Sequence, residues 1–231
     1  MEESEHSVPL AVENEHVYAV YDRIAGHFSS TRYSQWEGVV GFLRSLPYGS
    51  LVLDLGCGNG KYMAQKQSGL CVVGCDRSLE LLRICRQQHF DVTLVDGVFL
   101  PYRDDCFDAV ISIAVVHHLS TNALRRRFLA HLVRVLRCGG KGLIVVWALE
   151  KDTSGRKTKS NRGYEKADVM VQWQLQKKYA NGEEEPVYQR YYHMFQGGEL
   201  EWLLRSFEEI TITQSWYERE NWFVEIEKRF N

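Results

Sequence analysis

The chain has 231 residues, a formal net charge of −2, a hydrophobic fraction of 45% and a charged fraction of 25%. This composition is ordinary for a folded globular protein, and it provides no global positive charge that would attract nucleic acid. No run approaches the roughly 18 apolar residues of a membrane span. The acidic start MEESEHS does not match a secretion signal, so we expect the protein in the cytoplasm, with the nucleus as a second location.

Cysteine spacing gives no sign of a metal knuckle or a disulfide framework. The sequence contains no CxxC pair, and most of its cysteines lie inside apolar stretches, where free cysteine packs as a small core residue. The six cysteines are Cys57, Cys71, Cys75, Cys85, Cys106 and Cys138. We therefore predict no metal site in this chain.

Amphipathic helices are predicted first, and short β-branched runs then alternate with helical patterns. Predicted helices cover residues 15–28, 31–46, 78–88 and 122–137, and predicted strands cover 51–57, 71–76, 92–96, 108–115 and 142–147. Cys138-Gly139-Gly140 is expected to stop the fourth helix. This alternation is typical of an α/β fold with a doubly wound, mainly parallel sheet.

The last third of the chain begins with a basic stretch. Residues 151–166 hold six Lys or Arg against two acids and show no apolar periodicity, which predicts a mobile loop. Beyond it we expect a helix at 198–207 and antiparallel strands at 210–217 and 221–228. The prediction is a single domain, 1–231, with a helical cap at about 13–46, a cofactor-binding core at about 50–150, a mobile basic loop at about 151–187 and a C-terminal part at about 188–231.

The segment DLGCGNG, residues 54–60, joins the first predicted strand to a helix. Gly56, Gly58 and Gly60 allow a tight turn and a close approach of the backbone to a ligand. The dinucleotide fingerprint requires a further glycine where this chain has Lys61, which disfavours NAD.

Acids follow three successive predicted strands. Asp54 lies just before the glycines and suits a ligand that carries an ammonium group, while Asp76 can accept hydrogen bonds from ribose hydroxyls. Asp96-Gly97 follows the third strand. This pattern resembles the first motifs of class I methyltransferases that use S-adenosylmethionine (SAM), which implies a Rossmann-like seven-stranded sheet and places Asp96 and Gly97 against the adenine.

Residues 112–118, at the end of the fourth predicted strand, lie where methyltransferases place residues that contact the methyl acceptor, the group that receives the methyl. This segment lacks the Asn/Asp-Pro-Pro-aromatic motif of enzymes that methylate amino groups of bases and the Pro-Cys pair of those that methylate pyrimidine carbon. An oxygen acceptor is the simpler interpretation, although this stretch alone does not choose a substrate.

HFSSTRY (27–33) and RYYHMF (190–195) make the resemblance more specific. With the glycine loop and the segment NWFVEIEK (221–228), they resemble the eukaryotic tRNA wobble-uridine carboxymethyl methyltransferases in their free-standing form, over residues 13 to 229. The resemblance implies esterification of 5-carboxymethyluridine in the tRNA anticodon stem-loop. A carboxylate is already ionised at neutral pH, so we expect catalysis by positioning rather than by a general base.

The resemblance also implies roles for single residues, each set against plain packing or solvent exposure. Arg32 would hold the acceptor carboxylate or a neighbouring phosphate. Tyr21 and Phe28 would cap SAM, while His117 would line the acceptor site and His118 would be structural, because adjacent residues on a strand face opposite ways. The remaining candidates are Arg190, Tyr191, Tyr192 and His193 for stacking an unpaired base, and Asn221 and Trp222 for facing the substrate pocket. Of all these residues, Arg32, His117, Tyr191 and Asn221 are predicted to be catalytic.

Family members work with a small zinc-binding activator subunit that adds a strand to the sheet. The resemblance places that partner on the edge strand Val92 to Asp96 and the zinc in the partner. The basic loop would clamp the tRNA backbone or simply be a solvated face.

The alternative functions are methylation of a small carboxylic or phenolic metabolite, and a SAM-binding adaptor without catalysis. The intact acids and glycines count against the adaptor.

Overall fold

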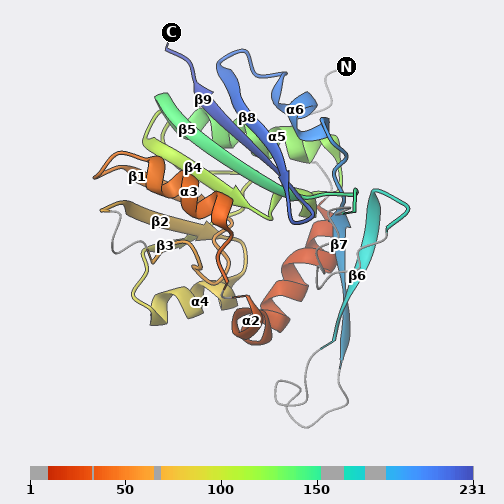
Figure 1. Cartoon of the computed structure of the whole chain (residues 1–231). Helices are drawn as coiled ribbons and strands as arrows, with labels where there is room; N and C mark the ends of the chain where they lie inside the picture. The colour runs from red at the N-terminus through yellow and green to blue at the C-terminus, as the bar shows by residue number, and fades with distance from the viewer. Residues whose placement is uncertain (1–9, 33, 65–68, 152–163, 175–185, 231) are drawn as a thin grey trace, which may run out of the picture.

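The computed structural model describes residues 10–32, 34–64, 69–151, 164–174 and 186–230. A central sheet has the strand order β3-β2-β1-β4-β5-β9-β8 (Figure 1). Its strands are β1 (Leu51–Leu55), β2 (Cys71–Asp76), β3 (Val92–Leu94), β4 (Phe107–Ile113), β5 (Leu136–Trp147), β8 (Ile210–Glu218) and β9 (Asn221–Lys228). The first five run parallel, and β9 pairs antiparallel with both β5 and β8. The predicted Rossmann-like doubly wound sheet is confirmed, with β3 at its edge.

Helices cover both faces of the sheet (Figure 1). They are α1 (Ala11–Glu13), the π-helical turn η1 (Asn14–Tyr18), α2 (Ala19–Thr31), α3 (Glu37–Ser45), α4 (Leu79–Gln87), the 3-10 turn η2 (Val116–His118), α5 (Asn122–Val135) and α6 (Glu199–Leu204). Successive side chains of β1 point to opposite faces of the sheet, so the hydrophobic core forms two clusters. Leu53 packs in the cluster that contains Phe128 of α5, and Val52 packs in the cluster that contains Leu43 of α3. None of the described helices has the length and apolarity to cross a membrane.

Two helix boundaries differ from the sequence prediction. The helix predicted at 31–46 begins only at Glu37. The helix predicted at 122–137 ends at Val135, and Leu136 already pairs with Phe107 of β4. Gly139 and Gly140 therefore lie inside β5, where the register against β4 shifts, and do not cap a helix.

A second sheet was not predicted. β6 (Asp168–Gln174) and β7 (Val187–His193) form an antiparallel pair beside α2 (Figure 1). The predicted loop at 151–187 is therefore wrong over β6, while its segments 152–163 and 175–185, including most of the basic stretch, lie outside the described residues. Trp173 forms this strand's buried contact, packing against Val20 and Ile24 of α2.

Candidate active site

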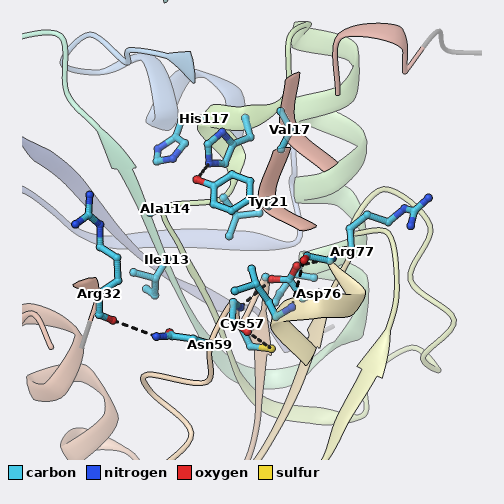
Figure 2. A pocket seen from close by; sticks show the side chains of 18 of the residues that line it. Val17, Tyr21, Arg32, Cys57, Asn59, Asp76, Arg77, Ile113, Ala114 and His117 are labelled. Carbon is cyan, nitrogen blue, oxygen red and sulfur yellow. Dashed lines mark hydrogen bonds between the residues drawn. The ribbon is translucent and has the colours of Figure 1, made fainter. Parts of the chain in front are cut away.

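A cavity of about 880 Å³ opens at the carboxyl ends of β1, β2 and β4, and α2 and β7 contribute to its walls. In Figure 2, Asp76 and Cys57 lie at one end, Tyr21 and His117 lie opposite them, and Arg32 lies to one side. Ligands of open α/β sheets bind outside the carboxyl ends of the strands, at the point where the strand order reverses. The cavity between β1 and β4 occupies that point.

The glycine loop follows β1 and needs backbone angles that favour glycine. Gly56 has a φ of 85°, and a Cβ added there would lie 2.3 Å from Cγ2 of Val115. Gly56 and Gly58 line the cavity. Gly60, with a φ of 75°, faces Phe90 instead, because an added Cβ would lie 2.7 Å from that ring. Gly60 was predicted to bind the cofactor, but it lies outside the cavity lining and contributes to the turn on the side that packs against Phe90.

Asp76 ends β2 and organises the loop. One carboxylate oxygen accepts a hydrogen bond from the backbone N–H of Gly58 at 2.8 Å, and the other accepts from the N–H of Ser78 at 2.8 Å. Burial raises the pKa of Asp76, and these backbone hydrogen bonds oppose the rise. Asp76 lines the cavity, where its remaining lone pairs are placed to accept hydrogen bonds from ribose hydroxyls.

Asp54 is 1% exposed, and its Oδ2 has no hydrogen-bond partner among the described residues. Burial raises its pKa to about 7, the nearby charge of Asp76 adds to the rise and Lys61 opposes it. A buried carboxylate oxygen without a donor is costly unless a ligand supplies one. The ammonium group of SAM fits this position.

Asp96 and Gly97 line the cavity just beyond β3. Oδ1 of Asp96 accepts a hydrogen bond from the backbone N–H of Val98 at 3.1 Å and from the Tyr18 hydroxyl at 3.4 Å. At Gly97 an added Cβ would lie 2.3 Å from the Phe128 ring, so the position requires a residue without a side chain. The predicted cofactor acids thus occupy three adjacent strand ends.

His117 and His118 both line the cavity, so the prediction that only one of them would do so is wrong. They lie in the 3-10 turn η2 and not on an extended strand, so they do not alternate between two faces. Burial lowers the pKa of His118 to about 3, which keeps the ring neutral. Its Nδ1–H donates to the carbonyl of Tyr191 at 2.9 Å, and its Nε2 accepts from the Tyr21 hydroxyl at 3.0 Å.

Strand β7 sends alternate residues to the cavity. Arg190 and Tyr192 line it, whereas the hydroxyl of Tyr191 points to the other side of the strand and donates to Asp168. The Tyr192 ring stacks on Trp147 with centroids 4.2 Å apart. Tyr191 was predicted as a catalytic residue, but the cavity lining contains its neighbours instead because side chains alternate along a strand.

Asn221 likewise lies outside the cavity lining, contrary to the prediction that it faces the substrate. Its amide donates to the carbonyls of Glu218 at 3.3 Å and Arg219 at 2.6 Å and so closes the turn between β8 and β9. Arg219 and Glu220 of that turn line the cavity. The role of Asn221 in this structure is to hold the turn.

Arg32 lines the cavity beside the glycine loop. Its carbonyl accepts a hydrogen bond from the Asn59 amide at 3.3 Å, and its guanidinium lies 5.3 Å from the centroid of the Trp173 ring. Burial lowers the pKa of Lys61 to about 8, which the charge of Asp54 opposes and that of Arg32 assists. Lys61 therefore interacts electrostatically with both Asp54 and Arg32, and all three residues line the cavity.

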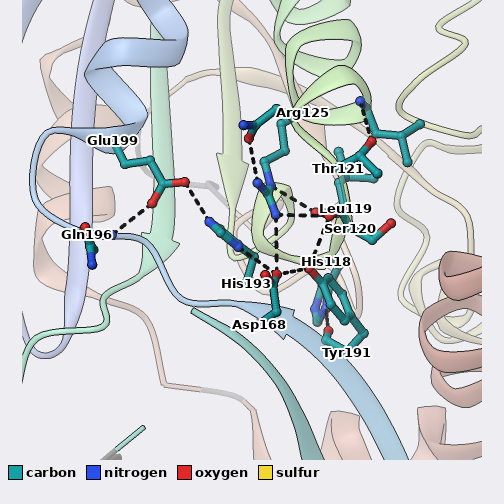
Figure 3. Close-up of polar contacts among 12 residues, drawn as sticks. His118, Leu119, Ser120, Thr121, Arg125, Asp168, Tyr191, His193, Gln196 and Glu199 are labelled. Carbon is teal, nitrogen blue, oxygen red and sulfur yellow. Dashed lines mark hydrogen bonds and ion pairs between the residues drawn. The ribbon is translucent and has the colours of Figure 1, made fainter. Parts of the chain in front are cut away.

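A polar cluster of Arg125, Asp168, Tyr191, His193 and Glu199 ties the β6–β7 pair to α5 and α6 (Figure 3). The His193 ring lies between two carboxylates, 2.9 Å from Asp168 and 2.7 Å from Glu199. Burial acts to raise the pKa of Asp168, but hydrogen bonds from Tyr191 and His193 lower it. Sequence reasoning named Tyr191 and His193 as base-stacking candidates, and Tyr191 also as a catalytic residue, and missed this cluster.

The described residues contain no group of three His, Cys, Asp or Glu side chains arranged to hold a metal ion.

A family model described as "Methyltransferase domain" matches residues 53–144. The DhpI-SAM-HEP complex has a TM-score of 0.69 with this chain at 16% identity, covering 95% of this chain and 99% of that one. A solved complex that contains the Haloferax volcanii Trm112 methyltransferase activator has a TM-score of 0.63 at 16% identity, covering 91% and 98%. Fold and site together define a class I methyltransferase that uses SAM.

Two relatives identify the family within that class. The Schizosaccharomyces pombe tRNA (carboxymethyluridine(34)-5-O)-methyltransferase is 40% identical, over 95% of this chain and 99% of that protein. The chain belongs to this family. The Xenopus tropicalis tRNA (carboxymethyluridine(34)-5-O)-methyltransferase alkbh8 is 39% identical over 94% of this chain, which spans only 41% of that protein.

Proposed function

We propose that this chain transfers a methyl group from SAM to the carboxylate of 5-carboxymethyluridine at the wobble position of tRNA, forming the methyl ester. The observation that carries the proposal is the match to the S. pombe enzyme across 99% of that protein's length. The cavity supports it, because the three acids that suit SAM lie together at the ends of adjacent strands.

The residues present fit SAM, which supplies an electrophilic methyl group when it is bound. Asp54 would accept hydrogen bonds from its ammonium group, and Asp76 from its ribose hydroxyls. Asp96 and the backbone at Gly97 would hold the adenine. These residues bind and orient the cofactor, and none of them needs to exchange a proton with the acceptor.

The acceptor end of the cavity suits a group that is already ionised. His118 has its pKa lowered to about 3, and both ring nitrogens are engaged by Tyr191 and Tyr21, so it is poorly suited to act as a base. A carboxylate with a pKa near 4 needs no base at neutral pH. Trp147 and Tyr192 form a stacked aromatic wall that excludes water and offers apolar surface to a base.

We also propose that a small zinc-binding activator docks on the edge strand. β3 pairs only with β2 in the described sheet, so its other edge is available for a further strand. Leu94 and Phe99, each 49% exposed, place apolar surface on and just after this strand. The partner's added strand would run along Val92 to Asp96, and its zinc would lie in the partner.

The test measures transfer of labelled methyl from SAM by the protein purified alone and together with the activator. The acceptors are tRNA with carboxymethyluridine, the same tRNA with unmodified uridine, and a set of small carboxylic acids and phenols. We expect transfer to the carboxymethylated tRNA only, strongly with the activator and poorly without it. Transfer to small acids without transfer to this tRNA would contradict the proposed substrate, and equal rates with and without the partner would contradict the activator.

A further inference from the structure

Arg190 is the most deeply buried cation of the cavity. It is 3% exposed, whereas the other Arg and Lys side chains that line the cavity are partly or fully exposed. We infer that Arg190 binds the carboxylate of the acceptor base and fixes it for methyl transfer. This inference rests on the proposed function and names the residue that recognises its substrate.

Among the described residues, no carboxylate lies within ion-pair distance of Arg190. Its Nη1 donates to the hydroxyl of Tyr192 at 2.6 Å and to that of Tyr21 at 3.4 Å, and its guanidinium lies 4.5 Å from the Trp173 ring centroid. Its Nε is buried without any hydrogen-bond partner within the described part of the chain. Burial acts to lower the pKa of Arg190, but Tyr192 and Tyr21 raise it, so the guanidinium stays charged in the cavity. An anionic ligand would satisfy the N–H group that has no partner.

Arg125 shows what a structural buried arginine looks like in the same protein. It is also 3% exposed, but its Nε donates to the carbonyl of Leu119 at 3.0 Å and its Nη2 lies 3.8 Å from the Asp168 carboxylate. Arg125 thus has a carboxylate within the fold, while Arg190 reaches the cavity with its Nε unsatisfied. This contrast separates a packing residue from a ligand-binding one.

The unsatisfied group of Arg190 has the geometry of a carboxylate receptor. Arginine binds a carboxylate with two parallel N–H donors, and Nε with Nη2 forms one such edge of the guanidinium. Tyr21 and Tyr192 occupy Nη1. They hold the guanidinium plane against rotation, and Nε remains the buried donor that a carboxylate would satisfy.

Two carboxylates would enter the cavity, one on SAM and one on the acceptor, and the cations divide between them. Arg32 lies over the Trp173 ring at 5.3 Å, as Arg190 does at 4.5 Å, while Lys61 interacts with the charge of Asp54, where the amino-acid end of SAM fits. Arg190 instead contacts Tyr21 and Tyr192, and Tyr21 is hydrogen-bonded to His118 at the acceptor end. Esterification removes the negative charge of the acceptor, so the product would lose its ion pair with Arg190 and leave.

The test compares two tRNAs that differ only at the wobble base, carboxymethyluridine and its neutral isostere carbamoylmethyluridine. Binding of both is measured with the protein–activator complex, alongside kcat/KM for the first tRNA and the affinity for SAM. We expect the wild type to prefer the carboxylate and Arg190→Met to bind both tRNAs equally within about twofold. Removing one side of a buried charge pair should lower kcat/KM at least about 30-fold. Affinity for SAM should stay within about twofold.

Arg190→Lys keeps the charge without the planar fork and covers the case in which Arg190→Met does not fold; its preference for the carboxylate should fall several-fold. Arg23→Met is the matched control, because Arg23 is an exposed arginine of α2 outside the cavity lining, and the preference should remain. The inference would be overturned if folded Arg190 variants kept the full preference for the carboxylate-bearing tRNA. It would also be overturned if Arg32→Met lost that preference and the Arg190 variants kept it. A fall in SAM affinity equal to the fall in kcat/KM would assign Arg190 to the cofactor. A wild type that methylates no carboxymethylated tRNA would instead overturn the proposed function itself.

Discussion

The two ends of the cavity are built in different ways. At the cofactor end, Asp54, Asp76 and Asp96 lie at the ends of adjacent strands, and backbone N–H groups of the loops after β1, β2 and β3 hold Asp76 and Asp96. At the acceptor end, Tyr21 meets His118 and Tyr192, which lie 97 and 171 positions away in the sequence. The cofactor end therefore depends on local backbone geometry, and the acceptor end depends on the packing of α2 and β7 against the sheet.

Replacing Asp76 by alanine should weaken SAM binding at the cofactor end, and this is the largest effect that we expect. The change removes the acceptor of two backbone hydrogen bonds as well as the predicted ribose contact, and hydrogen bonds to a charged group contribute about 1.5–3 kcal/mol each. We expect the Kd for SAM to rise at least about 100-fold, measured by calorimetry. A change below about fivefold would show that the loop and the ribose site do not need this carboxylate.

The pH dependence of SAM binding should report the ionisation of Asp54. With a pKa of about 7 the carboxylate is largely protonated below that pH, so the Kd should rise as the pH falls, approaching about tenfold per unit between pH 6 and 5. The same raised pKa means that the folded, ligand-free protein keeps the proton longer than the unfolded chain does. Its stability should therefore fall as the pH rises from about 4 to about 7.

Asp54→Asn is the control for both measurements. In this variant, SAM affinity and stability should both depend less on pH. The dependence that remains should come from Asp76, whose pKa is also raised. Binding and melting temperature followed over the same pH range check the result. Profiles in Asp54→Asn that match those of the wild type would assign the titration to another group.

Replacing Asp168 by asparagine should weaken the acceptor end only. It removes the charge that pairs with His193 and Arg125 and so loosens β6 and β7, which carry Trp173 and Arg190. Because Asp168 is partly exposed, we expect a modest loss, about fivefold in kcat/KM for tRNA, with SAM affinity unchanged. Asp104→Asn, which breaks an exposed ion pair with Arg134, is the matched control and should change neither value. Equal losses in SAM affinity and tRNA kinetics would show that the two ends are coupled.

Sequence patterns were sufficient for the cofactor end because its determinants are local. Gly56, Gly58, Asp76 and Asp96 follow directly from strand ends, and the doubly wound sheet follows from the alternation of strands and helices. The exception is Gly60, which has the same residue type and a similar backbone angle but faces Phe90. A spacing motif records which positions need glycine and not what each one contacts.

The acceptor end could not be derived in this way, because its partners come from distant segments. β6 carries a signal that sequence reasoning passed over, the alternation of Val169, Val171 and Trp173 in the segment DVMVQWQ. The charge of the adjacent basic stretch, residues 151–166, favoured the prediction of a loop instead. The choice between Tyr191 and Tyr192 depends on which side of β7 faces the cavity, and the pairing with β6 and the packing of Trp173 on α2 set that side.

The alternation along β7 also limits how this family can vary. A single residue inserted before Arg190 within β7 would exchange the two sides of the strand, bringing Tyr191 and His193 to the cavity and sending Arg190 and Tyr192 to Asp168. Both the cavity and the polar cluster would fail together. Natural length changes should therefore be confined to the segment between β6 and β7, and within β7 they should be absent or occur in pairs of residues.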